Sequence, residues 1–134
     1  ANAASIDKTV TVGDPQNVFV QRDEIRKYLS SMQSVILKGI ETPGNGFEEE
    51  TKGLNYKSVG NDKDALVQFY ISIGKRLDAP ALYRETTTIL RKYCMYEEEL
   101  AVIDAGLQNI VINNKHRLGL QERRKEVEGL IKKR

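Results

Sequence analysis

The sequence contains no tryptophan, one cysteine and one histidine among its 134 residues. A single cysteine cannot form a disulfide within the chain, so the composition is compatible with oxidising and with reducing compartments. Cys94 and His116 lie far apart, and no local motif joins them into a nucleophile and its base or into a zinc site. We therefore expect a protein that is not an enzyme, with no catalytic residue, no metal and no cofactor.

Long apolar runs and glycosylation signals are also missing. No stretch approaches the ~20 apolar residues that cross a bilayer, so we expect no transmembrane segment, and no N-x-[ST] sequon occurs. The hydrophobic share of 40% and the charged share of 30% are ordinary for a globular domain. A chain of this length can bury one core without disulfides, which indicates a single domain.

Two runs of three glutamates, at 48–50 and 97–99, are the most acidic stretches of the chain. Helical bundles that bind iron pair glutamates with a Glu-x-x-His spacing, and position 113, three before His116, is Asn. Adjacent side chains point around a helix and do not converge on one ion. We interpret both runs as solvated surface.

Apolar side chains recur near every 3.6 residues in several segments, which is typical of helices that bury one face. Asp14 and Pro15 are a suitable N-cap and first residue for the first helix, and Pro43 and Gly44 end it. Asn61 or Asp62 caps the second helix, and the Asp78-Ala79-Pro80 break begins the third. The pattern predicts helices near 15–41, 62–77, 80–112 and 116–133.

The third of these segments contains "YCMYEEEL", which surrounds the cysteine. Apolar residues, with Thr86 among them, alternate at spacings of four and three from Leu82 to Ile110, which predicts a helical seam through Tyr93 and Tyr96. We interpret Cys94 as a half-buried helix residue and the tyrosines as packing. The sequence leaves open whether 80–112 is one helix or two helices that are split near Tyr96.

The remaining stretches show no helical period. Residues 1–13 are small, polar and β-branched, so we expect an extended or flexible arm before a helical domain at 14–134. Residues 42–60 include four glycines and predict a long loop. Phe47, Leu54 and Tyr56 on this loop are candidate contacts for a partner. The predicted fold is all-α, an up-and-down bundle of about four helices with an N-terminal arm and a long loop after the first helix.

Positive charge gathers at the end of the chain. Residues 115–134 hold eight lysines and arginines against three glutamates, although the net charge of the whole chain is only +2. Such a segment is a solvated last helix, a docking face for an acidic protein, or a surface for nucleic acid. The candidate partner-binding residues here are Arg123, Arg124, Lys125, Lys132 and Lys133.

These features predict a non-catalytic helical-bundle subunit that docks onto a larger protein complex and stabilises it. The alternative is a small nucleic-acid-binding or regulatory protein that uses its basic last helix. Base recognition is less favoured, because glutamates interrupt the basic run and no aromatic or Asn/Gln-rich face accompanies it.

The start "ANAAS" has the small-residue character of an export cleavage region. A four-helix bundle with such a start and an N-terminal arm resembles the extrinsic lumenal subunits of photosystem II of the PsbQ type. This resemblance implies a non-catalytic subunit in photosynthesis, located in the thylakoid lumen and attached to a membrane-embedded complex. An exported protein of the lumen or periplasm is therefore favoured over a cytoplasmic one, and both stay open.

Overall fold

The computed structural model describes residues 15–41 and 43–133, and in this part 80% of the residues are helical and none forms a strand. The predicted all-α class is confirmed. The expected arm at 1–13 lies outside the described residues. No described helix is long and apolar enough to cross a membrane. The elements are α2 (Pro15–Leu29), the 3₁₀ turn η1 (Ser30–Met32), α3 (Gln33–Lys38), α4 (Phe47–Ser58), α5 (Asp62–Gly74), α6 (Pro80–Lys92), α7 (Tyr96–Asn109) and α8 (Asn114–Lys132).

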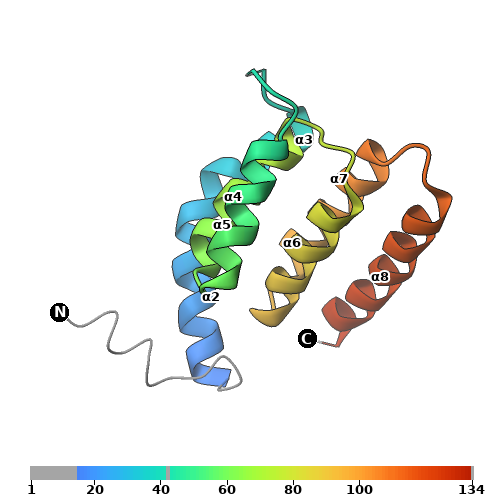
Figure 1. The fold of residues 1–134 in the computed structure, drawn as a ribbon. Coiled ribbons are helices and arrows are strands. Elements are labelled where there is room, and N and C mark those ends of the chain that lie inside the picture. Colours follow the sequence, from blue (N-terminus) through green and yellow to red (C-terminus); the bar gives the residue numbers. More distant parts are fainter. Residues whose placement is uncertain (1–14, 42, 134) are drawn as a thin grey trace.

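The helices run up and down beside one another (Figure 1). The stretch from α2 through η1 to α3 forms one long rod that packs against α5. In the middle of the molecule α5 contacts α6, and α7 contacts α3 and α6. Helix α4 packs mainly on α5, and α8 packs mainly on α7, so these two helices form opposite flanks.

The expectation of about four helices is too low, because the predicted loop at 42–60 contains a helix, α4, and the segment at 80–112 forms two helices, α6 and α7. The described part therefore has six helical rods when α2, η1 and α3 are taken together. Gly46 begins α4 with a φ of 95°, and the Asn45 side chain accepts a hydrogen bond of 3.0 Å from the Phe47 amide. A Cβ on Gly53 would lie 2.4 Å from the Phe69 ring, so this glycine permits close packing of α4 on α5.

Polar contacts fix α4 at several points. The Lys75 ammonium donates to the Glu49 carboxylate and to the carbonyl of Pro43, both at 2.9 Å. The Ser72 hydroxyl donates to the Gly46 carbonyl at 2.7 Å. These contacts join the start of α4 to the end of α5, which is why a segment rich in glycine and charge is ordered.

The segment at 80–112 is two helices, which resolves the alternative that the sequence left open. The break is the turn Tyr93–Met95, and Cys94 has the left-handed φ of 57°. The amide of Met95 donates to the Leu90 carbonyl at 2.9 Å, as in a helix end that closes on a left-handed residue. The Tyr93 hydroxyl donates to Asp62 at 2.6 Å, which ties the end of α6 to the start of α5. "YCMY" is therefore a helix-ending turn and not the middle of a helix.

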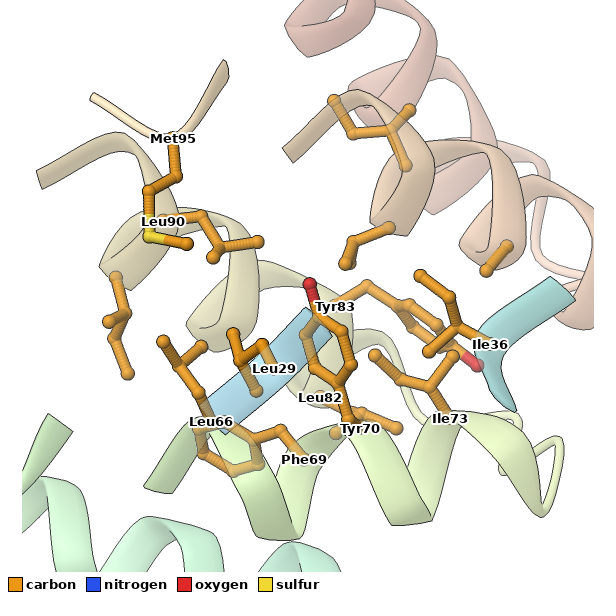
Figure 2. Packing of buried hydrophobic residues seen from close by; sticks show 14 of the residues in the cluster. Leu29, Ile36, Leu66, Phe69, Tyr70, Ile73, Leu82, Tyr83, Leu90 and Met95 are labelled. Carbon is orange, nitrogen blue, oxygen red and sulfur yellow. The ribbon is translucent and has the colours of Figure 1, made fainter. Parts of the chain in front are cut away.

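The core lies between α2, α3, α5, α6 and α7 (Figure 2). Its side chains come from most of the predicted apolar stripes, and they exclude water from the interface between the rods. This burial is the main favourable contribution to folding. The largest side chains with almost no exposed surface include Leu29, Ile36, Leu66, Phe69, Tyr70, Ile73, Leu82, Tyr83, Leu90 and Met95.

Two buried tyrosines in this core differ in how their hydroxyls are satisfied. The Tyr83 hydroxyl donates to the Leu77 carbonyl at 2.7 Å and accepts from the Asn109 side chain at 2.8 Å. Burial raises the pKa of Tyr83 to about 12. The Tyr70 hydroxyl has no hydrogen-bond partner among the described residues, and burial raises its pKa too.

Replacing each tyrosine by phenylalanine tests this difference. We expect Tyr83→Phe to lower the free energy of unfolding by ~1–2 kcal/mol, because it leaves the Leu77 carbonyl without its side-chain donor and removes one acceptor of the Asn109 side chain. Tyr70→Phe removes an unsatisfied buried hydroxyl and should leave stability unchanged or raise it. Urea unfolding followed by circular dichroism measures both. Equal losses in the two variants would contradict these assignments.

Two adjacent glutamates at the start of α4 should respond to pH in opposite ways. The hydrogen bond from Lys75 lowers the pKa of Glu49 below its usual 4.5, and burial raises the pKa of Glu50 above it. Ionised Glu49 therefore stabilises the fold above its usual pKa, and this contribution is lost as the pH falls through the lowered value. Ionised Glu50 destabilises the fold, and the penalty disappears as the pH falls through the raised value.

At about pH 7 we therefore expect Glu49→Gln to lower the free energy of unfolding and Glu50→Gln to raise it. Both differences from the parent chain should shrink on acidification, first as the pH falls through the raised pKa of Glu50 and then as it falls through the lowered pKa of Glu49. Thermal unfolding at several pH values measures the effect. A destabilised Glu50→Gln variant at neutral pH would show that this side chain has a favourable role in the folded state.

Candidate functional site

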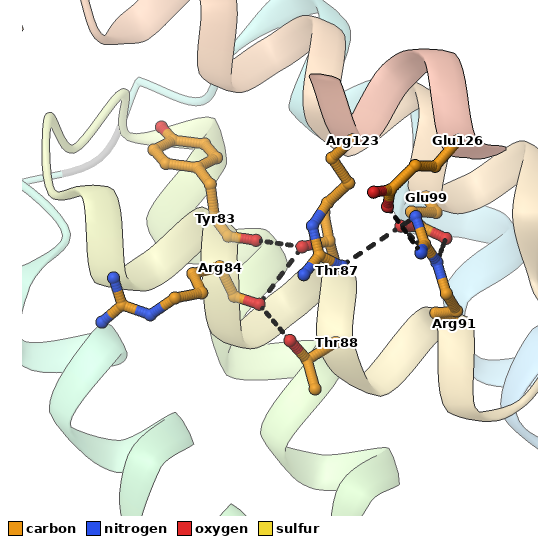
Figure 3. A network of polar contacts seen from close by, with 8 residues as sticks. All are labelled: Tyr83, Arg84, Thr87, Thr88, Arg91, Glu99, Arg123 and Glu126. Atoms are coloured by element: carbon orange, nitrogen blue, oxygen red, sulfur yellow. Dashed lines mark hydrogen bonds and ion pairs between the residues drawn. The ribbon is translucent and has the colours of Figure 1, made fainter. Parts of the chain in front are cut away.

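A buried carboxylate joins the three C-terminal helices. Glu99 in the first turn of α7 has 0% exposed surface. The Arg91 guanidinium of α6 donates to both of its oxygens at 2.8–3.1 Å, and Arg123 of α8 approaches it at 3.4 Å (Figure 3). Arg91 also donates to Glu126 of α8 at 3.0 Å. Arg91, Glu99, Arg123 and Glu126 are called the Glu99 cluster below.

The charges of this cluster depend on one another. Partial burial lowers the pKa of Arg91, but the hydrogen bonds to Glu99 and Glu126 outweigh that effect, so the pKa is raised. Glu99 has no solvent to hydrate it, and its two arginines supply the hydrogen bonds that water would otherwise make. The cluster therefore requires α6, α7 and α8 to keep one relative position.

The interpretation of the glutamates at 97–99 as solvated surface is wrong for Glu98 and Glu99. Beside the buried Glu99, the Glu98 carboxylate receives two hydrogen bonds from Arg26 of α2, at 2.6 and 2.9 Å. Glu97 lies further out. In the first run only Glu48 is well exposed, because Glu49 binds Lys75 and Glu50 is buried. Both runs form first turns of helices, where negative charge is favoured by the helix dipole.

A pocket of about 260 Å³ lies between the start of α6, the end of α7 and the first half of α8. Arg123 is common to this pocket and the Glu99 cluster. The pocket has an apolar part and a basic part, and no acidic residue lines it. Its lining residues are Pro80, Arg84, Ile110, Lys115, His116, Gly119, Leu120 and Arg123.

The chain around this pocket is basic and apolar together. We call residues 110–119 the α7–α8 corner; it contains Lys115, His116 and Arg117 and no acidic residue. Arg117 donates to the Leu107 and Ile110 carbonyls and thereby caps the end of α7. Val111 is 69% exposed and Ile112 is 85% exposed, although both are apolar. Contiguous exposed apolar side chains are typical of surfaces that bind another molecule.

The basic residues predicted to bind a partner have different environments. Arg123 belongs to the Glu99 cluster, and Arg124 pairs with Asp104 of α7 at 2.8 Å and with Glu128 at 2.9 Å. These two arginines therefore hold α8 on the bundle. Lys125, Lys132 and Lys133 are exposed and stay candidates for partner contacts.

The predicted apolar contacts lie on the opposite flank. Phe47, Leu54 and Tyr56 belong to helix α4 and not to a loop, and all three are exposed. The structure thus separates them from the basic residues of α8 by the width of the bundle, because α4 and α8 are its two outer helices. They stay predicted partner contacts, on a surface of their own.

Cysteine and histidine do not meet. Cys94 lies in the turn before α7, and His116 lies in α8 beyond the other end of α7. A helix of that length separates its ends by roughly 20 Å. Across residues 15–41 and 43–133, no three His, Cys, Asp or Glu side chains gather closely enough to hold a metal ion.

Sequence reasoning missed Pro80, Arg84 and Ile110 as parts of one site with α8. Their shared position depends on the packing of α6 and α7 against α8, which no local pattern reports. A weak signal was present in "NIVINN", where apolar residues stand between Asn109, which ends α7, and Asn113, which caps the start of α8.

Comparison with protein-family models finds no family that matches this chain, and comparisons with curated proteins and with solved structures find no match.

Removal of the buried charge tests the Glu99 cluster. We expect Glu99→Gln to lower the free energy of unfolding by ~2 kcal/mol, since it weakens the hydrogen bonds to two arginines. Glu126→Gln, on the exposed side of the same cluster, should cost less than ~1 kcal/mol. Chemical unfolding of both variants measures the difference. Equal effects would mean that burial does not set the strength of these contacts.

Proposed function

We propose that this chain is a non-catalytic helical subunit that docks onto a larger protein assembly through the α7–α8 corner. The observation that carries this proposal is the exposure of Val111 and Ile112 next to a run of basic residues. Burying the two apolar side chains would supply affinity, and Lys115, which has no ion-pair partner within 15–41 and 43–133, would favour an acidic surface.

The ion pairs of α8 support this role in a second way. Arg124 is bound to Asp104, and Arg123 is bound to Glu99, so the fold of α8 does not need a partner to neutralise them. A nucleic-acid binder of the kind considered above would require these arginines to contact phosphates. Their intramolecular partners favour a protein ligand over that alternative.

For the class of assembly, we propose that the chain is an extrinsic lumenal subunit of photosystem II of the PsbQ type. Two features support this class: the chain is all-helical, and it begins with small residues. The contacts of α8 are compatible with attachment to an acidic surface of such a complex. Identification of the proteins that accompany the chain would decide the class.

Two exposed valines give a matched test of the docking surface. Val111 lies in the α7–α8 corner, and Val59, at 77% exposed, lies in the turn between α4 and α5. Each is replaced by serine in the full tagged chain, which is added to an extract of the source cells. Neither change should alter stability, because both side chains are already in water.

We expect the parent chain and Val59→Ser to migrate with a large complex on native gels and to dissociate at about 1 M salt, where the range of surface charges falls to ~3 Å. Val111→Ser should migrate mainly as the free chain. Migration of the parent protein as a free chain at low salt would refute the docking function. Equal association of the two variants would place the interface elsewhere.

A further inference from the structure

We infer that the pocket between α6, α7 and α8 is an anchor site for an acidic side chain of the docking partner, a carboxylate carried between aliphatic residues. This inference rests on the proposed docking function and specifies the group that the partner inserts. The pocket supplies the two complementary surfaces for such a group. Pro80, Ile110 and Leu120 are apolar, and Arg84, Lys115, His116 and Arg123 are basic.

The positive charge of the pocket is only partly neutralised from within. Arg123 faces Glu99 at 3.4 Å, and Arg84 has a long contact of 3.9 Å with Glu85. Lys115 and His116 have no ion-pair partner among the described residues. The pocket also contains residues from the first two turns of α8, where the helix dipole adds positive potential. An inserted carboxylate would therefore meet the positive charge of Lys115, which has no ion-pair partner among the described residues.

Gly119 adds no side chain to the wall of the pocket. A glycine within a helix lowers stability by ~1 kcal/mol relative to alanine. Neither the backbone conformation nor close packing requires a glycine at position 119. A Cβ at Gly119 would meet nothing within 4 Å, and its φ is not left-handed. Because Gly119 lines the pocket, the missing side chain keeps the space open.

Most other described glycines have a local reason. Positive φ explains Gly39, Gly44, Gly46 and Gly60, and close packing explains Gly53, Gly74 and Gly106. Nothing in the structure explains Gly129, which also lies in α8 and has open space around it. Gly129 does not line the pocket and therefore serves as the matched control.

The size of the pocket restricts the ligand. About 260 Å³ accommodates one or two side chains and not a folded element. A glutamate side chain has an apolar stem that fits the apolar part of the pocket and a single negative charge for its basic part. Leucines on either side of the glutamate supply apolar groups that contact Val111 and Ile112. The probes are accordingly the capped peptides acetyl-Leu-Glu-Leu-amide, acetyl-Leu-Gln-Leu-amide and acetyl-Leu-Lys-Leu-amide, with acetate as a free anion.

Each probe is titrated into the full ¹⁵N-labelled chain and followed by amide chemical shifts. We expect the glutamate peptide to cause saturable shifts at Lys115, Gly119 and Leu120, with an affinity at least about fivefold higher than that of the glutamine peptide. The lysine peptide should not bind. Equal affinity of the glutamate and glutamine peptides, or an equal response to acetate alone, would overturn the assignment to a carboxylate on an apolar stem.

Gly119→Leu and Gly129→Leu separate the pocket from the rest of α8. Both replace a helical glycine in open space, so both variants should fold with equal or higher stability. Gly119→Leu should lower the affinity for the glutamate peptide at least about tenfold, and Gly129→Leu should leave it within about twofold. Equal peptide affinity in the two variants would refute the pocket as the binding site.

The outcomes distinguish this inference from the docking function. If the parent chain migrates with a large complex but the glutamate peptide does not shift the pocket amides, the anchor site is wrong and docking stands. If the peptide binds in the pocket and the chain always migrates alone, carboxylate recognition stands and the assembly role is wrong.

Discussion

The carboxylate of Glu99 is the constraint on which the C-terminal half of the molecule depends. It is fully buried, and its compensating charges come from two other helices, through Arg91 and Arg123. An unpaired buried charge costs several kcal/mol, so α6 and α8 cannot move away from α7 without a large penalty. Leu120 and Val127 bury apolar surface of α8 in the core, and the Glu99 cluster adds a charged contact that restricts the position of α8. The position of α8 in turn forms the pocket.

The two acidic runs show what the sequence could and could not reveal about the fold. The segments that the apolar spacing predicts as helical contain α2–α3, α5, α6, α7 and α8, because core packing follows that period, but the spacing did not decide whether 80–112 is one helix or two. It missed α4, whose glycines indicate a loop although Gly53 serves close packing against Phe69. Three consecutive glutamates after Gly46 and after Met95 are typical of a first helical turn and would have marked both helix starts. The predicted apolar seam from Leu82 to Ile110 is present, but the turn Tyr93–Met95 divides it between α6 and α7.

The candidate site was less accessible to sequence reasoning. The excess of basic residues at 115–134 is visible in the sequence, but the ion-pair partners of its arginines within the fold are not. Arg124 binds Asp104, and Arg123 binds Glu99, across separations that no helical spacing connects. Consequently Arg123 and Arg124, two of the five predicted basic contacts, have ion-pair partners within the fold, whereas Lys115 and the apolar Val111 are exposed. The pocket itself requires α6 and α8 to pack against α7, so its existence could be known only from the structure.

The central claim is that Glu99 holds α8 in place, and native-state hydrogen exchange of Glu99→Gln tests it most directly. Amide exchange reports the local opening of each helix separately. We predict that the amides of α8 lose protection by a larger factor than those of α5, because the described ion pairs of the Glu99 cluster join only α6, α7 and α8. If α8 keeps the protection of the parent chain, or if all helices lose protection equally, α8 is held by something other than this buried charge.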